Sequence, residues 1–523
     1  RVYCMQNKNI EKISNNKRIA KNTLLLYCRM LLLMIISLYT SRVILNALGV
    51  EDYGIYNVVG GVVSLFSMLS GSISAAISRY MTFELGKRDN KNMQSIFCTA
   101  INIQLMIVLA ITILLETVGL WFMNNKMVIS PERADAAYWC FQFSVITFGV
   151  NLLSTPYNAI IVAYERMSAF AYISLFDAIS KLAIAFVILL NPIDRLVYYG
   201  ALVLVAGIIQ RYLYVLYCRK HFSECRYTLI FDRKITKEMF GFAGWNFIGA
   251  SSAVLRDQGG NILINMFCGA TVNAARGIAM SVNSAVYGFV ANFMIALNPQ
   301  ITKNYASGDY GYMFSLAFQG ARLSYYILLI LSLPIFVTTP YLLHLWLGIV
   351  PEHASNFTRL VLLFTMSESL ASPLVTIMLA TGKIKNYQLI VGGLQLLNLP
   401  ISYVGLKLGF PPEVTFITAI IVSVVCEFAR LIMLRKMVGL SIRKFLKDVY
   451  INVVIVTVVA AILPLIIDFF IDAYNFKLFS ITVLCSVISA MMAIYYVGCT
   501  ASDRVFITQY VSKFLKKLND KAK

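Results

Sequence analysis

Apolar runs of about 20 residues recur along nearly the whole chain, separated by short polar segments. A run of this length crosses the hydrocarbon core of a bilayer, about 30 Å thick, as one α-helix. The pattern predicts an all-α, polytopic membrane protein with about 14 transmembrane helices. The predicted spans cover residues 22–45, 55–80, 97–119, 136–156, 168–190, 196–217, 239–262, 274–298, 321–340, 356–380, 386–406, 414–434, 449–471 and 476–498.

The composition supports this interpretation and leaves little room for a soluble domain. Hydrophobic residues make up 59% of the chain and charged residues 13%, whereas a soluble domain carries about 25% charged residues. The loops between the predicted spans are short. The ten cysteines and three histidines are scattered, so we expect no metal site. We also expect no enzymatic activity.

The basic residues define a direction across the membrane. The chain has 45 Lys and Arg against 25 Asp and Glu. Thirty of the 45 fall in the two termini and in alternate loops, and only five in the other loops. By the positive-inside rule, both termini of this multi-pass protein are expected in the cytoplasm. The excess charge is explained by lipid headgroups, so we expect no nucleic-acid partner.

A weak internal repeat divides the predicted spans into two halves. A shift of 220 residues aligns spans 1 and 2 with spans 7 and 8, and pairs Gly49 with Gly269 and Asp89 with Asp309. Repeats of six helices are related by a pseudo-twofold axis along the membrane normal, an arrangement known among transporters. The expected organisation is a cytoplasmic N-terminal segment (1–21), an N-lobe (22–217), a basic linker (218–238), a C-lobe (239–434), a cytoplasmic loop (435–448), a helix pair (449–498) and a basic tail (499–523).

Five of the arginines that fall inside predicted spans or at their edges have no suitably placed acid on their own helix. They are Arg29, Arg42, Arg79, Arg256 and Arg276. A charge within a bilayer is expensive and therefore suggests a functional site. The only acid beside Arg256 is Asp257, which points about 100° away around an ideal helix. Because a guanidinium suits phosphate oxygens bidentately, these arginines are candidate diphosphate ligands. For any single one of these arginines, the alternative explanation is that its side chain extends to the lipid headgroups. Arg359 fits this alternative explanation.

Other intramembrane charges have partners on their own helix. Asp177 and Lys181 are four residues apart, and Glu427 and Arg430 are three apart. This spacing predicts structural ion pairs. Glu368 and Asp257 lack such a partner, so each is a candidate site for a coupling H⁺ or Na⁺ or a buried structural carboxyl. No other cofactor is expected.

Small polar residues line one face of the second predicted span. Ser64, Ser67, Ser74 and Ser78 recur at spacings of three or four or their sums, interleaved with glycines. The stripe can serve close helix packing or can form a hydrophilic cavity wall that ends beside Arg79.

Two segments carry a resemblance to a known family. ARGIAMSVNSAVYGFVANFMIALNPQITKNYASGD (275–309) closely resembles bacterial O-antigen and polysaccharide flippases, and SRVILNALGVEDYGIYNVVGG (41–61) is similar to the matching family segment. These flippases belong to the multidrug/oligosaccharidyl-lipid/polysaccharide exporter superfamily. The resemblance implies two six-helix lobes around a cationic cavity, with a C-terminal helix pair. It also implies transport of an undecaprenyl-diphosphate-linked oligosaccharide, such as an O-antigen or capsule repeat unit, from the cytoplasmic to the periplasmic leaflet by alternating access.

Three other functions stay open at this point. A cation-coupled multidrug antiporter of the same superfamily has the same general architecture, but an arginine-lined cavity would repel a cationic drug. A lipid II flippase shares the cationic cavity and the span number. A membrane glycosyltransferase or polymerase normally needs a large extramembrane loop, which this chain lacks. The expected partners are the lipid-linked substrate, the bilayer and, as a further candidate, the polysaccharide polymerase machinery.

Overall fold

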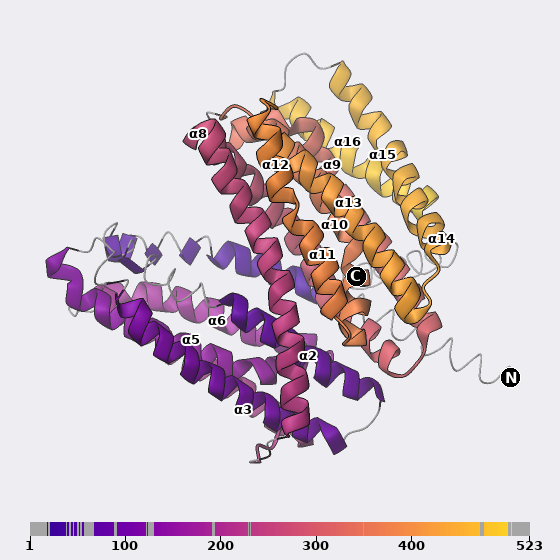
Figure 1. Cartoon of the computed structure of the whole chain (residues 1–523). Coiled ribbons are helices and arrows are strands. Elements are labelled where there is room, and N and C mark those ends of the chain that lie inside the picture. Colours follow the sequence, from indigo (N-terminus) through magenta and orange to yellow (C-terminus); the bar gives the residue numbers. More distant parts are fainter. Residues whose placement is uncertain are drawn as a thin grey trace, which may run out of the picture. The chain divides into compact units, whose positions relative to one another are not determined.

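The computed structural model is all-α in the part of the chain that it describes (Figure 1). It describes residues 21–37, 67–87, 91–121, 130–190, 194–228, 232–348, 350–470 and 475–499, with Arg18, Arg504, positions 123 and 230 and short pieces between residues 39 and 56. Eleven of the described helices are long and apolar enough to cross a membrane. These eleven correspond to predicted spans 3–6 and 8–14. The predicted all-α, multi-pass membrane fold is confirmed.

The chain folds into two compact units that do not follow its linear order. Unit 1 comprises residues 1–251, 295–313 and 376–389. Unit 2 comprises residues 252–294, 314–375 and 390–523. Unit 1 therefore includes two short segments from the second half of the chain, residues 295–313 and 376–389.

Unit 1 is built on five helices and on a helical segment at residues 21–37. The helices are α2 (Ser67–Lys87), α3 (Lys91–Leu114), α5 (Ala134–Ala163), α6 (Met167–Val187) and α7 (Arg195–His221). Short turns, η1 (Leu115–Gly119), η2 (Pro131–Arg133), η3 (Ile188–Leu190) and η4 (Ser223–Cys225), extend or connect them. One core joins α3 to α5 through buried residues such as Leu115 and Phe141. With 30 residues, α5 is about 45 Å long and reaches across a bilayer.

The long helix α8 (Arg233–Ala306) reverses direction at Gly269, whose φ of 83° is outside the helical region. Arg276 Nε lies 2.8 Å from Asn261 Oδ1. In a straight helix these two residues would be about 22 Å apart, so the two arms of α8 form a hairpin. The first arm contains predicted span 7, which is helical despite its polar sequence.

Unit 2 contains the middle of α8 and most of the remaining helices. They are α9 (Tyr310–Leu347), α10 (Ala354–Thr381), α11 (Lys385–Leu396), α12 (Asn398–Lys407), α13 (Val414–Val438), α14 (Ile442–Phe445), η5 (Leu446–Ile451), α15 (Asn452–Phe469), α16 (Phe476–Ala493) and η6 (Ile494–Gly498). Its core packs the α8 hairpin against α9, α10 and α13, with Phe357 and Phe416 at the centre. Gly439 in the left-handed conformation ends α13.

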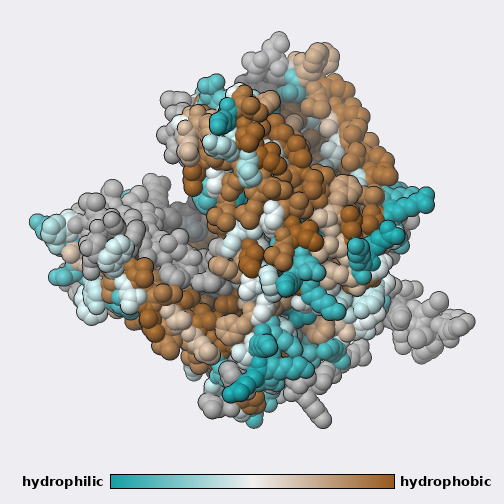
Figure 2. Space-filling model, viewed as in Figure 1, coloured by the Kyte–Doolittle hydropathy of each residue, from teal (hydrophilic) through white to brown (hydrophobic). Residues whose placement is uncertain are grey.

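Large apolar side chains cover the outer surface of unit 2 (Figure 2). On α15, for example, Val454 and Val458 are more than half exposed. Apolar patches of this size on a soluble protein would drive association. On a helical membrane protein they are the surface that faces the lipid tails.

Candidate functional site

Arg79 lies near the end of α2 and binds the last turn of α10 within unit 1. Its Nε donates to the carbonyl oxygen of Leu379 at 2.9 Å, and its Nη2 donates to that of Ala380 at 3.1 Å. The final four carbonyls of a helix lack intrahelical partners and carry the negative end of the helix dipole. Arg79 therefore satisfies backbone acceptors and partly neutralises a helix terminus.

The surroundings of Arg79 are aromatic. Its guanidinium carbon lies 4.6 Å from the ring centre of Tyr80, 5.2 Å from that of Phe83 and 5.3 Å from that of Phe242. Gly382 follows α10 with a φ of 73°, and a side chain there would meet the guanidinium. Among the described residues, no carboxylate lies within 4.0 Å of Arg79. Its charge is held by dipoles and π-faces only.

The other predicted residues of unit 1 are only partly described. Arg29 stacks on Phe170, with its guanidinium carbon 4.4 Å from the ring centre. Ser74 and Ser78 are half-buried on α2. Arg42, Ser64 and the side chain of Ser67 lie outside the described residues. Cavity lining by the serine stripe stays a prediction.

In unit 2, Arg256 is paired with its neighbour, contrary to the sequence prediction. Arg256 Nε lies 2.9 Å from Asp257 Oδ1. The angle of about 100° between adjacent residues does not separate them, because their Cα atoms are only about 3.8 Å apart and the arginine side chain is long enough to bend back. The same guanidinium lies 5.0 Å from the ring centre of Phe364. The view of Arg256 and Asp257 as unpaired charges was wrong.

Arg276 lies on the second arm of the α8 hairpin and is 5% exposed. Its Nε donates to Asn261 Oδ1 at 2.8 Å, and its Nη2 donates to the backbone carbonyl of Asp257 at 3.4 Å. Gly260 makes this approach possible, since a Cβ atom there would lie 2.7 Å from the guanidinium. Like Arg79, Arg276 has no carboxylate within 4.0 Å among the described residues.

Glu368 on α10 faces a polar stretch of α13. Ser423 Oγ donates to Glu368 Oε1 at 2.6 Å. Glu427 follows Ser423 by one helical turn, is 1% exposed and lies 3.7 Å from Arg430. The predicted Glu427–Arg430 pair is present, as is the Asp177–Lys181 pair at 2.8 Å. Ser423 thus bonds Glu368 and lies one helical turn from Glu427, a neighbour that the sequence did not indicate for Glu368.

Glu165 is the residue that the sequence analysis missed. It lies between α5 and α6 in the left-handed conformation, with φ of 57°, and its side chain is 1% exposed. Gln300 donates to its carboxylate at 2.7 Å, Lys303 at 2.7 Å and Arg18 Nε at 2.9 Å. Gln300 and Lys303 belong to the NPQITKNYASGD motif, so the motif itself was the available signal. We refer to these four residues as the Glu165 cluster.

A second ionic cluster lies at the other end of α5. Arg133 bridges two carboxylates, with its Nε 2.8 Å from Asp52 Oδ1 and its Nη1 bound to Asp194. Burial tends to raise the pKa of Asp194, but hydrogen bonds from Arg133 and from the amides of Val197 and Leu196 outweigh it and hold the pKa below its usual range. Asp52 lies in residues 41–61, one of the two segments that carry the family resemblance. We refer to these three residues as the Arg133 cluster.

Nothing in the described part of the chain indicates a metal centre. No group of three or more His, Cys, Asp or Glu side chains there has the arrangement of a metal site. The site residues that the structure describes are mainly arginines with polar and aromatic neighbours.

Comparison with known proteins identifies both a family and a fold. A family model described as "Polysaccharide biosynthesis protein" matches residues 19–305. A search of curated proteins found no match. An outward-facing multidrug resistance MATE family transporter of the MOP superfamily shares 12% identity over 81% of this chain and 95% of its own, with a TM-score of 0.70.

Two further solved structures show the same fold. MATE in the bent conformation has 13% identity over 81% of this chain and 95% of that chain, with a TM-score of 0.70. A MOP superfamily transporter from Pyrococcus furiosus has 12% identity over 81% and 95%, with a TM-score of 0.68. That protein is described as having a binding pocket of reverse polarity, which suggests a different function for it.

Proposed function

Because the chain belongs to the polysaccharide biosynthesis protein family, we propose that it is a flippase for a lipid-linked oligosaccharide. The proposed substrate is an undecaprenyl-diphosphate-linked repeat unit of an O-antigen or capsule. It moves from the cytoplasmic to the periplasmic leaflet of the bacterial inner membrane by alternating access, coupled to an ion. The likeness to multidrug transporters concerns the fold and supports this architecture.

The observation that carries the proposal is the state of Arg79 and Arg276. Both guanidinium groups are held by neutral oxygens and aromatic rings, with no carboxylate within 4.0 Å among the described residues. A diphosphate can replace a neutral carbonyl or amide acceptor without breaking an ion pair. The hydrogen bonds to the substrate would then join opposite charges, and the planar guanidinium can bind phosphate oxygens bidentately.

The arginines divide by predicted depth. Arg29 and Arg79 are expected toward the cytoplasmic leaflet and would capture the diphosphate. Arg276, with Arg42 and Arg256, is expected toward the outer leaflet and would receive it. The pairing of Arg256 with Asp257 weakens its attraction for an anion, so Arg276 is the stronger candidate in unit 2.

Coupling requires a group that changes its charge or binds a cation during the cycle. Glu368 is our candidate, because Ser423 holds its carboxylate one helical turn from Glu427. Asp257 is a weaker candidate, since Arg256 already neutralises it.

Alternating access also requires contacts that break. Within unit 1, the two Arg79 hydrogen bonds bind the end of α10 to α2. We expect these bonds to open when the transporter changes state. They are polar and few, so they can be exchanged for water at moderate cost.

Deletion of the gene with a surface-glycan readout tests the function. Loss of surface polysaccharide with lipid-linked repeat units accumulating on the cytoplasmic side supports the flippase. Drug sensitivity with normal glycan would instead support a multidrug antiporter, and accumulation of lipid II a lipid II flippase. A membrane glycosyltransferase or polymerase would leave unextended or unpolymerised units that had already crossed the membrane.

Point variants then test the site. In the complemented strain, Arg79→Ala and Arg276→Ala are expected to reduce export. Arg359→Ala is the matched control, because Arg359 also donates to a carbonyl and stacks on the same residue, Phe336. Full export by normally inserted Arg79→Ala and Arg276→Ala proteins contradicts the proposed diphosphate site. Unchanged transport by Glu368→Gln and Asp257→Asn across pH and Na⁺ gradients contradicts the coupling role.

A further inference from the structure

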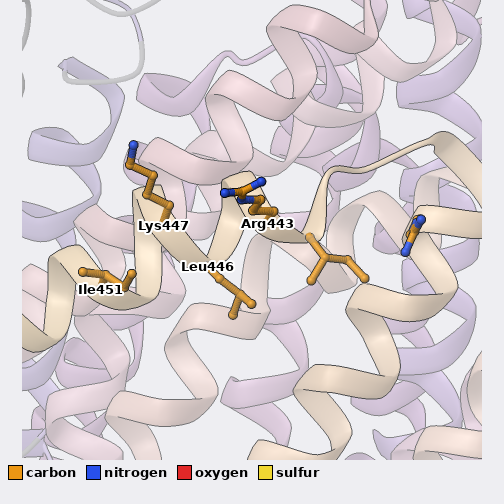
Figure 3. A pocket seen from close by; sticks show the side chains of 6 residues that line it. Arg443, Leu446, Lys447 and Ile451 are labelled. Carbon is orange, nitrogen blue, oxygen red and sulfur yellow. The ribbon is translucent and has the colours of Figure 1, made fainter.

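A cavity of about 580 Å³ opens on unit 2 between the end of α13 and the beginning of the α14–α15 segment (Figure 3). Its lining is half cationic and half aliphatic: Arg435, Arg443 and Lys447 with Ile442, Leu446 and Ile451. Figure 3 shows Arg443 and Lys447 extending toward the same side, with Leu446 turned away from them. The cavity therefore has a charged rim and an apolar floor.

The three cations lack acidic partners. In the described ranges, no carboxylate lies within 4.0 Å of Arg435, Arg443 or Lys447. Arg443 and Lys447 are four residues apart, so their side chains lie one above the other on the same helical face. Arg435 approaches from α13. Three unneutralised charges around one cavity create a local site for an anion.

The apolar floor continues as a stripe along α15. Ile451, Ile455, Val458 and Ile462 follow one another at spacings of three or four residues, and each is at least 46% exposed. This spacing keeps them on one face of the helix. The stripe leads from the cavity into the surface that faces the lipid tails. A soluble anion would gain nothing from such a track, whereas an anion with an acyl chain would.

We propose that this cavity binds an anionic phospholipid of the bilayer. The phosphate lies between Arg435, Arg443 and Lys447, and one acyl chain follows the stripe from Ile451 along α15. Basic pockets between transmembrane helices bind acidic lipid headgroups in this way. The site is separate from Arg79 and Arg276, and its occupancy does not depend on which substrate the protein transports.

Lipid binding to the purified protein in a neutral maltoside detergent tests the proposal. Native mass spectrometry and a titration with fluorescent phosphatidylglycerol measure the affinity, and phosphatidylcholine serves as the zwitterionic reference. The Arg443→Gln/Lys447→Gln variant is expected to bind phosphatidylglycerol about thirtyfold more weakly, since each basic residue near an anionic surface contributes about 1 kcal/mol. The matched control is Lys436→Gln/Lys444→Gln, which removes the same charge from exposed residues that do not line the cavity.

Each outcome decides for or against the site. Preference of the wild type for phosphatidylglycerol, lost in the cavity variant and kept in the control, supports it. Equal affinity of the wild type for both lipids overturns it, as does an equal loss in the two double variants, which would indicate diffuse surface charge. Displacement of phosphatidylglycerol by inorganic phosphate alone would assign a soluble anion. Displacement by low concentrations of farnesyl diphosphate would assign the polyprenyl diphosphate. Either result would overturn the phospholipid assignment.

Discussion

The two ionic clusters of unit 1 differ from Arg276 of unit 2 in how a charge is met, although unit 2 also contains the buried Glu427–Arg430 pair. In unit 1, Glu165 receives hydrogen bonds from three side chains, and Arg133 is bound by two carboxylates. In unit 2, the buried Arg276 donates to an amide oxygen and a backbone carbonyl and stacks on Phe416. The first arrangement pairs opposite charges; the second gives a positive charge neutral acceptors.

We use this difference to separate charges that we expect to stabilise the fold from those that we propose to bind substrate. Removing one partner from a cluster of opposite charges lowers the free energy of unfolding strongly, because the remaining charges lose their counter-charge. An arginine held by neutral oxygens loses less, and it can accept an anion instead. Arg79 falls between these cases: it has no carboxylate, but it meets the negative end of the α10 dipole.

The largest effect is expected at the Glu165 cluster. Glu165→Ala leaves Lys303 and Arg18 without their shared carboxylate and should lower the free energy of unfolding by about 3–5 kcal/mol. Thermal unfolding in detergent measures it. Glu238→Ala is the control, because Glu238 is exposed and makes a single weak hydrogen bond to Tyr80. Equal melting temperatures for Glu165→Ala and wild type would contradict the structural role assigned to the Glu165 cluster in unit 1.

Arg276→Ala should separate transport from stability. Loss of its two hydrogen bonds is expected to cost about 2 kcal/mol in unfolding free energy, while export falls tenfold or more because the anion loses a charge-assisted partner. Arg276→Lys keeps the charge without the planar fork and should restore part of the export. Glycan display in the complemented strain measures export, and thermal unfolding of the same variant in detergent measures stability. An Arg276→Ala protein with low thermal stability and full export would contradict this prediction, because Arg276 would then serve stability and not transport.

The fold was predictable because it depends on long apolar runs. Helix length and hydrophobicity are properties of a continuous segment, and eleven of the predicted spans appear as helices of sufficient length. The ion pairs at spacings of three and four were predictable for the same reason. Span 7 shows the limit: Asn261 and Gly260, in its polar part, serve a tertiary contact with Arg276 that helix length and hydrophobicity do not reveal.

The partners of the site residues were not predictable in this way. Arg79 binds carbonyls 300 residues away, and Glu165 is bound by side chains about 135 residues away. A single sequence contains no distance information at that range, and backbone carbonyls carry no sequence signal at all. The prediction for Arg256 was wrong for another reason. It used the helical angle between Arg256 and Asp257, whereas the length of the arginine side chain decides whether the two charges can pair.

A smaller effect is expected from Gly382→Ala. Gly382 has a φ of 73°, which costs an L-residue about 1–2 kcal/mol, and the new methyl group would also meet the guanidinium of Arg79. We expect a lower melting temperature together with weaker protection of the α10 terminus in hydrogen exchange. Gly393→Ala is the matched control, since nothing lies within 4 Å of its added methyl and α11 should gain helix propensity. Equal responses at the two glycines would show that Arg79 does not depend on this turn.

The smallest effect concerns the pH dependence of the Arg133 cluster. The pKa of Asp194 is held below its usual value in the folded protein, chiefly by Arg133 against the opposing effect of burial. Such a group contributes stability above its unfolded pKa, about 3.9, and loses it as the pH falls through the lower folded value. Asp194→Asn should therefore flatten the acid limb of stability below about pH 4. Asparagine still caps α7, where Asp194 accepts from the amides of Leu196 and Val197, so the helix itself is spared. Asp135→Asn, an exposed carboxylate in the first turn of α5, serves as the control. An acid limb that Asp194→Asn leaves unchanged would mean that Arg133 is balanced by Asp52 alone, and unit 1 would then differ from unit 2 less than its two clusters indicate.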